Sequence, residues 1–288
     1  MIKIVESQRD FGSMSAGSIR YSNLTEQDKQ LLCAKYNIQL KDLEELDLSQ
    51  DKKDLFAIHR NNMGANMGFD GRRMFMADQE HKTGTHFEIT EDYARANPNG
   101  WTDIPEDILV VRRETPGIVI GHPVADCPVV MMMDRKNGIT AIGHCSAEMI
   151  DKRLPMMITE VLRRQYGSKA DDIITYVSAC IGENWTYDIF PKWAKDAKVW
   201  DHCIVQGDDG LFHINMKPAI MAQLISSGLD RENMMFSFDD TQMNPNYYSN
   251  SLASRKENPV VEKNGRHFAG MFYTDDDTND VEIHKGRR

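Results

Sequence analysis

The stretch that decides the fold reads Val124-Ala125-Asp126-Cys127-Pro128-Val129-Val130, three methionines, Asp134-Arg135-Lys136-Asn137-Gly138 and Ile139-Thr140-Ala141-Ile142-Gly143-His144-Cys145. Two short apolar runs are joined here by a loop that contains Asn-Gly, and this pattern predicts a β-hairpin. The methionines at 131–133 are expected to be core residues of the first strand. We therefore expect the rest of the chain to be organised around residues 124–148.

Cys127 stands just before the first apolar run, and His144 ends the second. In an antiparallel pair the start of one strand lies beside the end of the next, so the two side chains can meet. Pro128 favours an extended backbone at Cys127 and so limits where the thiol points. A thiol and an imidazole brought together form either a nucleophile–base pair or two metal ligands. The alternative is a half-buried cysteine and a hydrogen-bonded histidine at two strand ends.

Other strands and helices flank this hairpin. Pro155 is expected either to kink the helix that follows the hairpin or to mark its true first turn, and Gly167 is expected to end it. Strands and helices alternate irregularly, which indicates an α+β fold, a single domain with a mixed β-sheet flanked by helices. The apolar patterns predict strands at 74–81, 107–111, 117–121, 172–177, 234–238 and 268–273, and helices at 24–36, 148–166 and 218–227. Thr25 is the expected N-cap of the first helix.

Four segments show no clear period. Residues 42–54 are acidic and are expected to form a solvated helix or loop, and residues 61–68 are rich in turn formers and begin a new segment. Residues 91–104 are predicted to be a loop. Residues 274–288, dense in charge, are predicted to be a flexible tail.

A third candidate ligand is His81. It follows the apolar segment Met74-Phe75-Met76-Ala77, which is predicted to be a strand leading to the histidine. His86 lies five residues further on, so in an extended chain it would point to the opposite face from His81.

Composition narrows the class of protein. The 288 residues carry a formal charge of −10 and are 41% hydrophobic, values typical of a globular chain without a basic surface for nucleic acid or an anionic membrane. No apolar run reaches membrane-spanning length, and the first residues lack the apolar core of a signal peptide. The five cysteines are widely spaced without a CxxC motif, which indicates a reduced, cytoplasmic protein. A monomer or small homo-oligomer that binds a small molecule fits this composition.

An ordered set of short motifs resembles the laccase-domain family, which is also labelled multicopper polyphenol oxidase. The likeness covers roughly residues 60–273, with residues 1–60 as an N-terminal extension of the same domain. Each motif is weak alone, and the order makes the set specific. The matching segments are Gln79-Glu80-His81, Ala125-Asp126-Cys127-Pro128, Gly143-His144-Cys145, Ala179-Cys180-Ile181-Gly182, Tyr187-Asp188-Ile189, Gln223-Leu224, Gly228-Leu229, Ser254-Arg255 and Gly265-Arg266.

The resemblance implies a zinc-dependent enzyme that acts on purine nucleosides, by phosphorolysis of adenosine, inosine or methylthioadenosine, by deamination of adenosine, or by both. Two histidines and one cysteine, here His81, Cys127 and His144, leave a fourth zinc position open, as in catalytic sites. Zinc would lower the pKa of a bound water to about 7. Asp126 could orient a ligand imidazole, and we assign Cys127 and Asp126 to catalysis.

Copper also suits two histidines and a cysteine, so a copper-dependent polyphenol oxidase is one alternative. Four-copper reduction of oxygen needs a larger histidine set with His-x-His pairs, and this chain has nine histidines and no such pair. A relative that binds metal without catalysis is a further alternative.

Three departures from the family pattern affect the substrate site. Ala147 and Glu148 replace the family's tryptophan and arginine after the histidine, Ile220 replaces an asparagine, and Asp240 replaces a cysteine. A carboxylate at position 148 would repel phosphate, which favours hydrolytic over phosphorolytic chemistry. We assign substrate contacts to Gln79, Glu148, Arg255 and Arg266.

Overall fold

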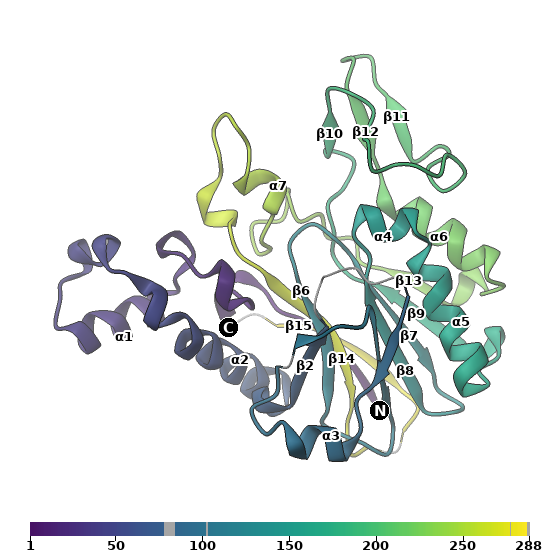
Figure 1. Ribbon diagram of the computed structural model, residues 1–288, viewed down its shortest axis with the longest axis horizontal. Coiled ribbons are helices and arrows are strands. Elements are labelled where there is room, and N and C mark those ends of the chain that lie inside the picture. Colours follow the sequence, from purple (N-terminus) through teal and green to yellow (C-terminus); the bar gives the residue numbers. More distant parts are fainter. Residues whose placement is uncertain (78–83, 102, 277, 287–288) are drawn as a thin grey trace.

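The protein folds into four layers, two six-stranded β-sheets packed face to face with helices on both outer sides (Figure 1). The computed structural model describes residues 1–77, 84–101, 103–276 and 278–286. The predicted mixed sheet flanked by helices is confirmed, although one sheet was expected and the sandwich is built from two. In the described part of the chain, no helix is long and apolar enough to cross a membrane.

The first sheet joins the two ends of the chain to its middle, in the order β15-β1-β14-β6-β2-β4. Strand β14 is antiparallel to both β1 and β6, whereas β15 is parallel to β1 and β2 is parallel to both β6 and β4. Its strands are β1 (Ile2–Glu6), β2 (Met74–Ala77), β4 (Asp103–Ile104), β6 (Val119–Val124), β14 (His267–Tyr273) and β15 (Val281–Lys285).

The second sheet contains the predicted hairpin, in the order β13-β9-β7-β8-β5-β3. Strands β7 and β8 pair antiparallel, with Val129 opposite His144 and Asp134 opposite Ile139, so the hairpin and its register are confirmed. Its strands are β3 (His86–Glu88), β5 (Ile108–Arg112), β7 (Val129–Asp134), β8 (Ile139–His144), β9 (Ile173–Val177) and β13 (Met234–Phe236).

Alternation along β7 divides its side chains between two cores. Val129, Met131 and Met133 enter the core between the two sheets, and Val130 and Met132 face the helices on the other side. All are fully buried, so the expectation that the three methionines are core residues is confirmed. A strand buried on both faces reads as a continuous apolar run, which is why this segment shows no polar alternation.

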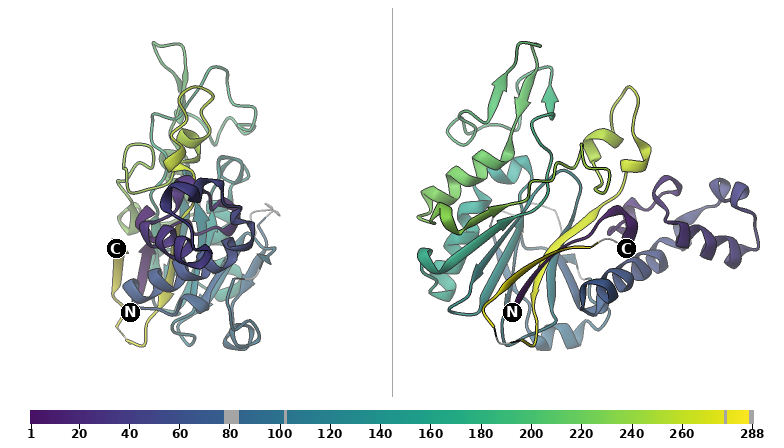
Figure 2. Two further views of the ribbon diagram at one scale, coloured as in Figure 1. Left: turned by 90° about the vertical axis from the view of Figure 1, so that its left-hand side faces the viewer. Right: turned by 180° about the vertical axis from the view of Figure 1, so that it is seen from behind.

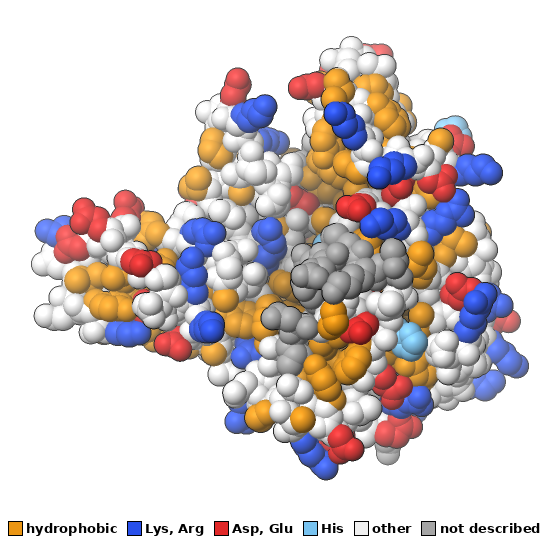
Figure 3. All heavy atoms as spheres, in the orientation of Figure 1, with side chains coloured by type: hydrophobic (Ala, Val, Ile, Leu, Met, Phe, Trp, Pro, Cys, Tyr) orange, Lys and Arg blue, Asp and Glu red, His pale blue; other side chains and the backbone are white. Residues whose placement is uncertain are grey.

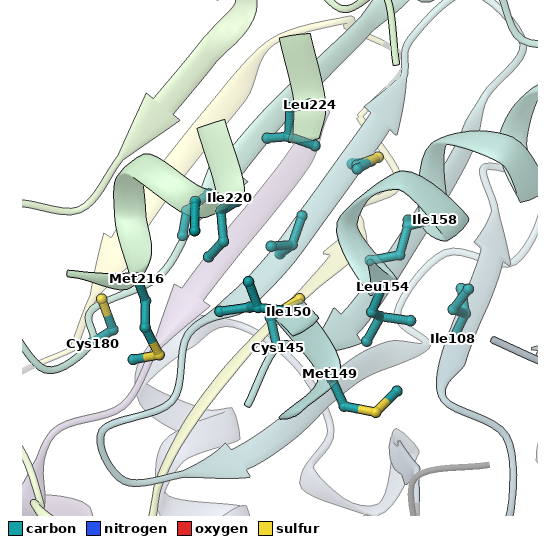
Figure 4. Close-up of a cluster of buried hydrophobic side chains, with 14 of the residues drawn as sticks. Ile108, Cys145, Met149, Ile150, Leu154, Ile158, Cys180, Met216, Ile220 and Leu224 are labelled. Carbon is teal, nitrogen blue, oxygen red and sulfur yellow. The ribbon is translucent and has the colours of Figure 1, made fainter. Parts of the chain in front are cut away.

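Helices cover both outer faces (Figure 2). Helix α2 (Lys52–Met67) lies over the first sheet, with α1 (Glu26–Tyr36) beyond it (Figure 1), while α4 (Ala147–Asp151), α5 (Leu154–Tyr166) and α6 (Met216–Ser226) lie over the second. Figure 4 shows side chains of α4, α5 and α6 interlocked above the second sheet. Thr25 caps α1 by accepting from Asp28 N, and Gly167 ends α5, as predicted.

Two lobes rise above the sandwich and flank its upper edge (Figure 1). One is a three-stranded sheet in the order β10-β12-β11, and the other carries the short helix α7 (Asn250–Ala253). The sheet is formed by β10 (Thr186–Tyr187), β11 (Ile204–Gln206) and β12 (Phe212–Ile214). Short 3-10 helices join the other elements at Arg9–Phe11, Ala16–Ser18, Tyr21–Asn23, Leu40–Glu45, Leu48–Gln50, Gly71–Arg73, Ala170–Asp172, Arg231–Asn233 and Val261–Lys263.

Two expectations are wrong. Residues 61–68 were expected to begin a new segment, but helix α2 continues to Met67, because packing of Met63 and Met67 into the core outweighs the low helix propensity of asparagine and glycine. Gly64 serves close packing, since a Cβ there would lie 2.5 Å from Phe69 O. Residues 91–104 contain helix α3 (Glu91–Ala96) and strand β4, and Thr90 caps α3 by accepting from Tyr93 N at 3.2 Å.

Two further details concern helix and chain ends. Pro155 lies in the first turn of α5, so it marks a helix start and α4 is a separate helix. The predicted flexible tail is wrong for Val281–Lys285, because β15 pairs with β1 along its whole length. β15 is an edge strand of the first sheet, and charged residues such as its Glu282 and Lys285 are common on edge strands.

Candidate active site

A pocket of about 350 Å³ lies at the upper edge of the sandwich, between the two lobes. In Figure 3 this edge is a hollow with hydrophobic side chains on the β10–β12 side. The volume is in the range of small-ligand sites, about 300–1,000 Å³. Its described lining residues are Ala125, Asp126, Cys127, Ile181, Trp185, Thr186, Tyr187, Met216, Asn250, Ser251 and Ser254.

Asp126 holds the pocket floor to the α7 lobe. Its backbone has φ 83°, an uncommon left-handed conformation for a residue other than glycine, and its carbonyl accepts from Ile181 N at 2.8 Å. The carboxylate oxygens accept from Thr241 Oγ1 and from Ser251 N, each at 2.6 Å. Burial raises the pKa of Asp126, although these two hydrogen bonds oppose the shift. The contacts make Asp126 a positioning residue for α7, and its catalytic assignment stays a prediction.

Cys127 follows directly and is half-buried in the pocket wall. Burial, and then the charge of Asp126, raise the pKa of its thiol to about 12, against a smaller lowering by Arg266. The thiol is therefore protonated at neutral pH unless a bound cation stabilises the thiolate. Cys145 and Cys180 point into the helix–sheet core (Figure 4) and are not among the described residues that line the pocket.

His144 ends β8 beside the start of β7, and the next residue fixes the junction because Cys145 N donates to Pro128 O at 2.9 Å. The ring of His144 is almost fully buried and lies 5.9 Å from that of His122 on β6, centroid to centroid. Gly143 precedes it, and a Cβ there would lie 2.9 Å from Ile158 Cδ1 of α5. Glycine thus allows α5 to pack closely against this end of β8.

The third predicted ligand, His81, and the predicted substrate residue Gln79 lie outside the described residues. Within the part of the chain that is described, no three His, Cys, Asp or Glu side chains gather as a metal site would require. The trio His81, Cys127 and His144 therefore stays a prediction, of which the structure describes two members. The ring of His86, on β3, packs against that of Tyr166 with centroids 6.2 Å apart, and His86 is not among the described residues that line the pocket.

The other predicted substrate residues fall at different distances from the pocket. Arg266 is half-buried beside Cys127 and Asp126, its charge lowers the pKa of Cys127, and its Nη1 donates to Gly265 O at 2.7 Å. Arg255 is exposed, and Glu148 is exposed and pairs with Lys152 at 2.8 Å. Neither Arg255 nor Glu148 is among the described residues that line the pocket.

Several pocket residues were not predicted from the sequence. Trp185 lies just before β10 and Tyr187 ends it, and this strand of two residues is too short to show a period, while Asn250, Ser251 and Ser254 come from the α7 lobe. A cluster of five aromatic residues between 185 and 200 was the available signal. Behind the α7 lobe, the buried Lys263 Nζ donates to the carbonyls of Thr241, Asn244 and Tyr247 at 2.6–2.9 Å.

Solved structures share this fold. The hypothetical protein YfiH from Bacillus licheniformis superposes with a TM-score of 0.62 at 16% identity, covering 77% of this chain and 82% of that one. YlmD from Geobacillus stearothermophilus gives a TM-score of 0.64 at 15% identity, with the same coverage of each chain. At these identities the likeness shows the fold alone.

Sequence comparison adds a relative and a family. A protein named adenosine deaminase RL5, from an unknown prokaryotic organism, is 27% identical over 139 residues, which is 46% of this chain and 50% of that protein. The aligned region therefore spans half the length of this curated relative. The family model described as multi-copper polyphenol oxidoreductase laccase matches residues 38–272, which include the pocket and all but the two ends of the sandwich. This chain belongs to the multi-copper polyphenol oxidoreductase laccase family.

Proposed function

We propose that this protein is a zinc-dependent enzyme that acts on purine nucleosides, by deaminating adenosine or by phosphorolysis of adenosine, inosine or methylthioadenosine. The observation that carries the proposal is the Asp126–Cys127 pair in the wall of a nucleoside-sized pocket. Family membership and the relative named adenosine deaminase support it.

The donor chemistry of the described residues fits a zinc ion. Cys127 offers a thiol and His144 an imidazole from adjoining strand ends, the two ligand types that zinc prefers. We propose His81 as the third ligand. A zinc ion in such a site supplies Lewis-acid activation of water and deprotonates the ligating thiol.

The chain's own residues would hold the nucleoside and fix its orientation. Ser251 and Ser254 offer hydroxyl groups on the α7 wall, and Asp126 keeps that wall in place through the amide of Ser251. Arg266 supplies positive charge beside Asp126 and Cys127. Because Glu148 replaces the family's arginine, we propose that deamination is favoured over phosphorolysis.

The test is metal analysis and a product screen on the same protein samples. Wild type should contain one zinc per chain and convert adenosine to inosine, or adenosine or inosine plus phosphate to free base and ribose 1-phosphate. Cys127→Ala should lose both the zinc and the product. Cys33→Ala is the matched control, because it removes another half-buried thiol. Cys33 lies on α1, on the outer side of the first sheet and not in the pocket.

Two outcomes would contradict the proposal. A full zinc equivalent in Cys127→Ala would place the metal elsewhere, and zinc-loaded wild type without nucleoside turnover would make this a non-catalytic relative. Copper-dependent oxidation of a phenol with oxygen uptake would support polyphenol oxidation, the activity in the family's description. Oxygen uptake is therefore measured with an electrode on the same samples whose nucleoside products are separated by chromatography.

A further inference from the structure

The β10–β12 lobe contains a stack of aromatic rings that ends at the pocket. The rings of Trp185 and Trp193 are stacked, with centroids 5.5 Å apart and planes 9° from parallel. Trp193 in turn meets Trp200 edge-on at 4.9 Å, and Tyr187 meets Trp185 edge-on at 5.5 Å. Trp185 and Tyr187 line the pocket. One face of the Trp185 ring is thus backed by Trp193.

The stack is fixed to the body of the protein. Trp200 is buried, and its indole Nε1 donates to Asp151 Oδ1 at the end of α4, at 2.9 Å. The same oxygen accepts from Lys195 N and Asp196 N, at 2.8 and 2.9 Å. The backbone of Trp185 is held as well, because its carbonyl accepts from Ile214 N at 3.0 Å. The aromatic wall is therefore preorganised and does not have to form when a ligand binds.

The two walls of the pocket differ in chemistry. The β10–β12 side presents Trp185 and Tyr187, and the α7 side presents Asn250, Ser251 and Ser254. A ligand that fits both walls has a flat π-system on one side and hydroxyl groups on the other. A flat ring gains from stacking on an aromatic side chain whatever its edge pattern, because every such ring has a π-face.

We propose that Trp185 is the stacking surface for the ligand's aromatic ring and so determines specificity and orientation at this site. The inference rests on the proposed function, in which the ring is a purine base. The base lies against Trp185, with Trp193 behind it, and the ribose hydroxyls face Asn250, Ser251 and Ser254. Trp185 thereby selects for a flat ring, and the α7 wall selects for a sugar.

The test is equilibrium binding, measured by calorimetry in the absence of turnover. Inosine and ribose are the two probes, and the holoenzyme is used throughout. Trp185→Leu should weaken inosine binding about 10- to 100-fold, the usual effect of removing one stacked aromatic ring, and leave ribose binding unchanged. Trp185→Phe should restore inosine affinity to within a few-fold, since it keeps a π-face.

Tryptophan fluorescence gives a second readout if Trp185→Leu fails to fold. Inosine should quench the emission of wild type, and Trp185→Phe should lose most of the quenching while keeping affinity. Trp101→Phe is the matched control, because Trp101 packs against Phe56 of α2, on the outer side of the first sheet. This variant should keep both the inosine affinity and the quenching of wild type.

The outcomes separate the stacking role from the reaction. Turnover of nucleosides with unchanged inosine affinity in Trp185→Leu would overturn the inference and leave the proposed function standing. Trp185-dependent inosine binding without any product would support the inference and contradict the function. Equal weakening of inosine and ribose, or no inosine binding by wild type, would overturn the stacking role.

Discussion

Asp126 and Glu6 are both buried carboxylates whose pKa is raised by burial, and they lie in regions of opposite character. Asp126 lines a pocket together with the thiol of Cys127. Glu6, the last residue of β1, is fully buried in a closed network: its Oε2 accepts from Ala179 N at 3.2 Å and from Tyr247 OH at 3.3 Å, and Tyr176 OH bonds Oε1.

The Glu6 network joins the two sheets at their edge. Tyr247 OH also approaches Asp239 Oδ2 at 3.3 Å, and Asp239 accepts from Lys285 Nζ at 2.5 Å. Lys285 belongs to β15, so the network explains why the end of the chain is ordered as a strand. The comparison teaches that a raised carboxyl pKa reports burial, whereas a candidate site also needs access to a cavity and a neighbouring reactive group.

The largest expected effect on stability follows from removing Glu6, the buried carboxylate that does not line the pocket. Glu6→Ala should lower the free energy of unfolding by about 3–5 kcal/mol, because it leaves the Tyr176 hydroxyl and the Ala179 amide without this acceptor and removes one of the two acceptors of the Tyr247 hydroxyl. Urea unfolding measures the loss. The control is Glu282→Ala on β15, a half-exposed residue 3.6 Å from Lys3, which should cost about 0.5 kcal/mol or less. Loss of inosine binding by folded Glu6→Ala would contradict the distinction between the two regions.

Local patterns predicted one part of this molecule well. Cys127, His144 and the hairpin between them lie within 25 residues, where alternation and an Asn-Gly loop fix the pairing. The caps of α1 and α5 were visible for the same reason. The family resemblance pointed to Arg266 as a substrate residue, and the structure places it beside Cys127, although residues 127 and 266 are far apart in the sequence.

Long-range contacts account for what the sequence did not predict. The pairing of β1 with β14 and β15 joins the two ends of the chain, and no local period encodes it. Trp185 reaches the pocket only because a lobe of very short strands folds over the sandwich edge. Low helix propensity at residues 61–68 gave a wrong prediction for the second half of α2, where packing into the core decides the conformation.

The second expected effect concerns the acid in the pocket. Asp126→Asn keeps the shape of the side chain but places an NH₂ group against Thr241 or Ser251, both of which donate to the carboxylate. We expect a loss of about 1–3 kcal/mol in the free energy of unfolding and weaker inosine binding, since the α7 wall loses its anchor.

The matched control is Asp134→Asn at the other end of β7. Asp134 is also buried and accepts from two backbone amides, Lys136 N and Asn137 N, each at 3.0 Å. The Asp134→Asn variant should lower the free energy of unfolding about as much as Asp126→Asn does, while its inosine affinity stays at the wild-type value. Equal loss of binding in both variants would mean that Asp126 affects the ligand only through global stability.

A smaller effect is the pH dependence that Glu6 contributes. Its folded pKa is raised above the ordinary value of 4.5, so its contribution to stability is fully present below the unfolded pKa and is lost as pH rises through the folded pKa. The free energy of unfolding of wild type minus that of Glu6→Gln should therefore fall as pH increases above about 4.5, by at most about 1.4 kcal/mol per pH unit. Lys285 opposes the shift, so Lys285→Met should steepen the fall. Urea midpoints at several pH values measure it, and a difference that rises with pH would refute the assignment.

The smallest expected effect concerns Glu148, which the sequence assigned to the substrate site and the structure places on the exposed side of α4. Glu148 and Glu160 form equivalent i,i+4 pairs, with Lys152 and Arg164, and their side chains are 56% and 52% exposed. Glu148→Arg and Glu160→Arg should each cost about 0.3–1 kcal/mol in the free energy of unfolding, because each replaces an exposed attraction with a repulsion. Both variants change the charge of the molecule by the same amount, so any difference between them reports the position of the residue. If Glu148 faces bound phosphate, only Glu148→Arg should tighten phosphate binding, by up to about tenfold. Calorimetry with inorganic phosphate distinguishes the two. Equal phosphate affinity in wild type and both variants would remove Glu148 from the substrate site and leave Arg266 as the positive charge beside Cys127.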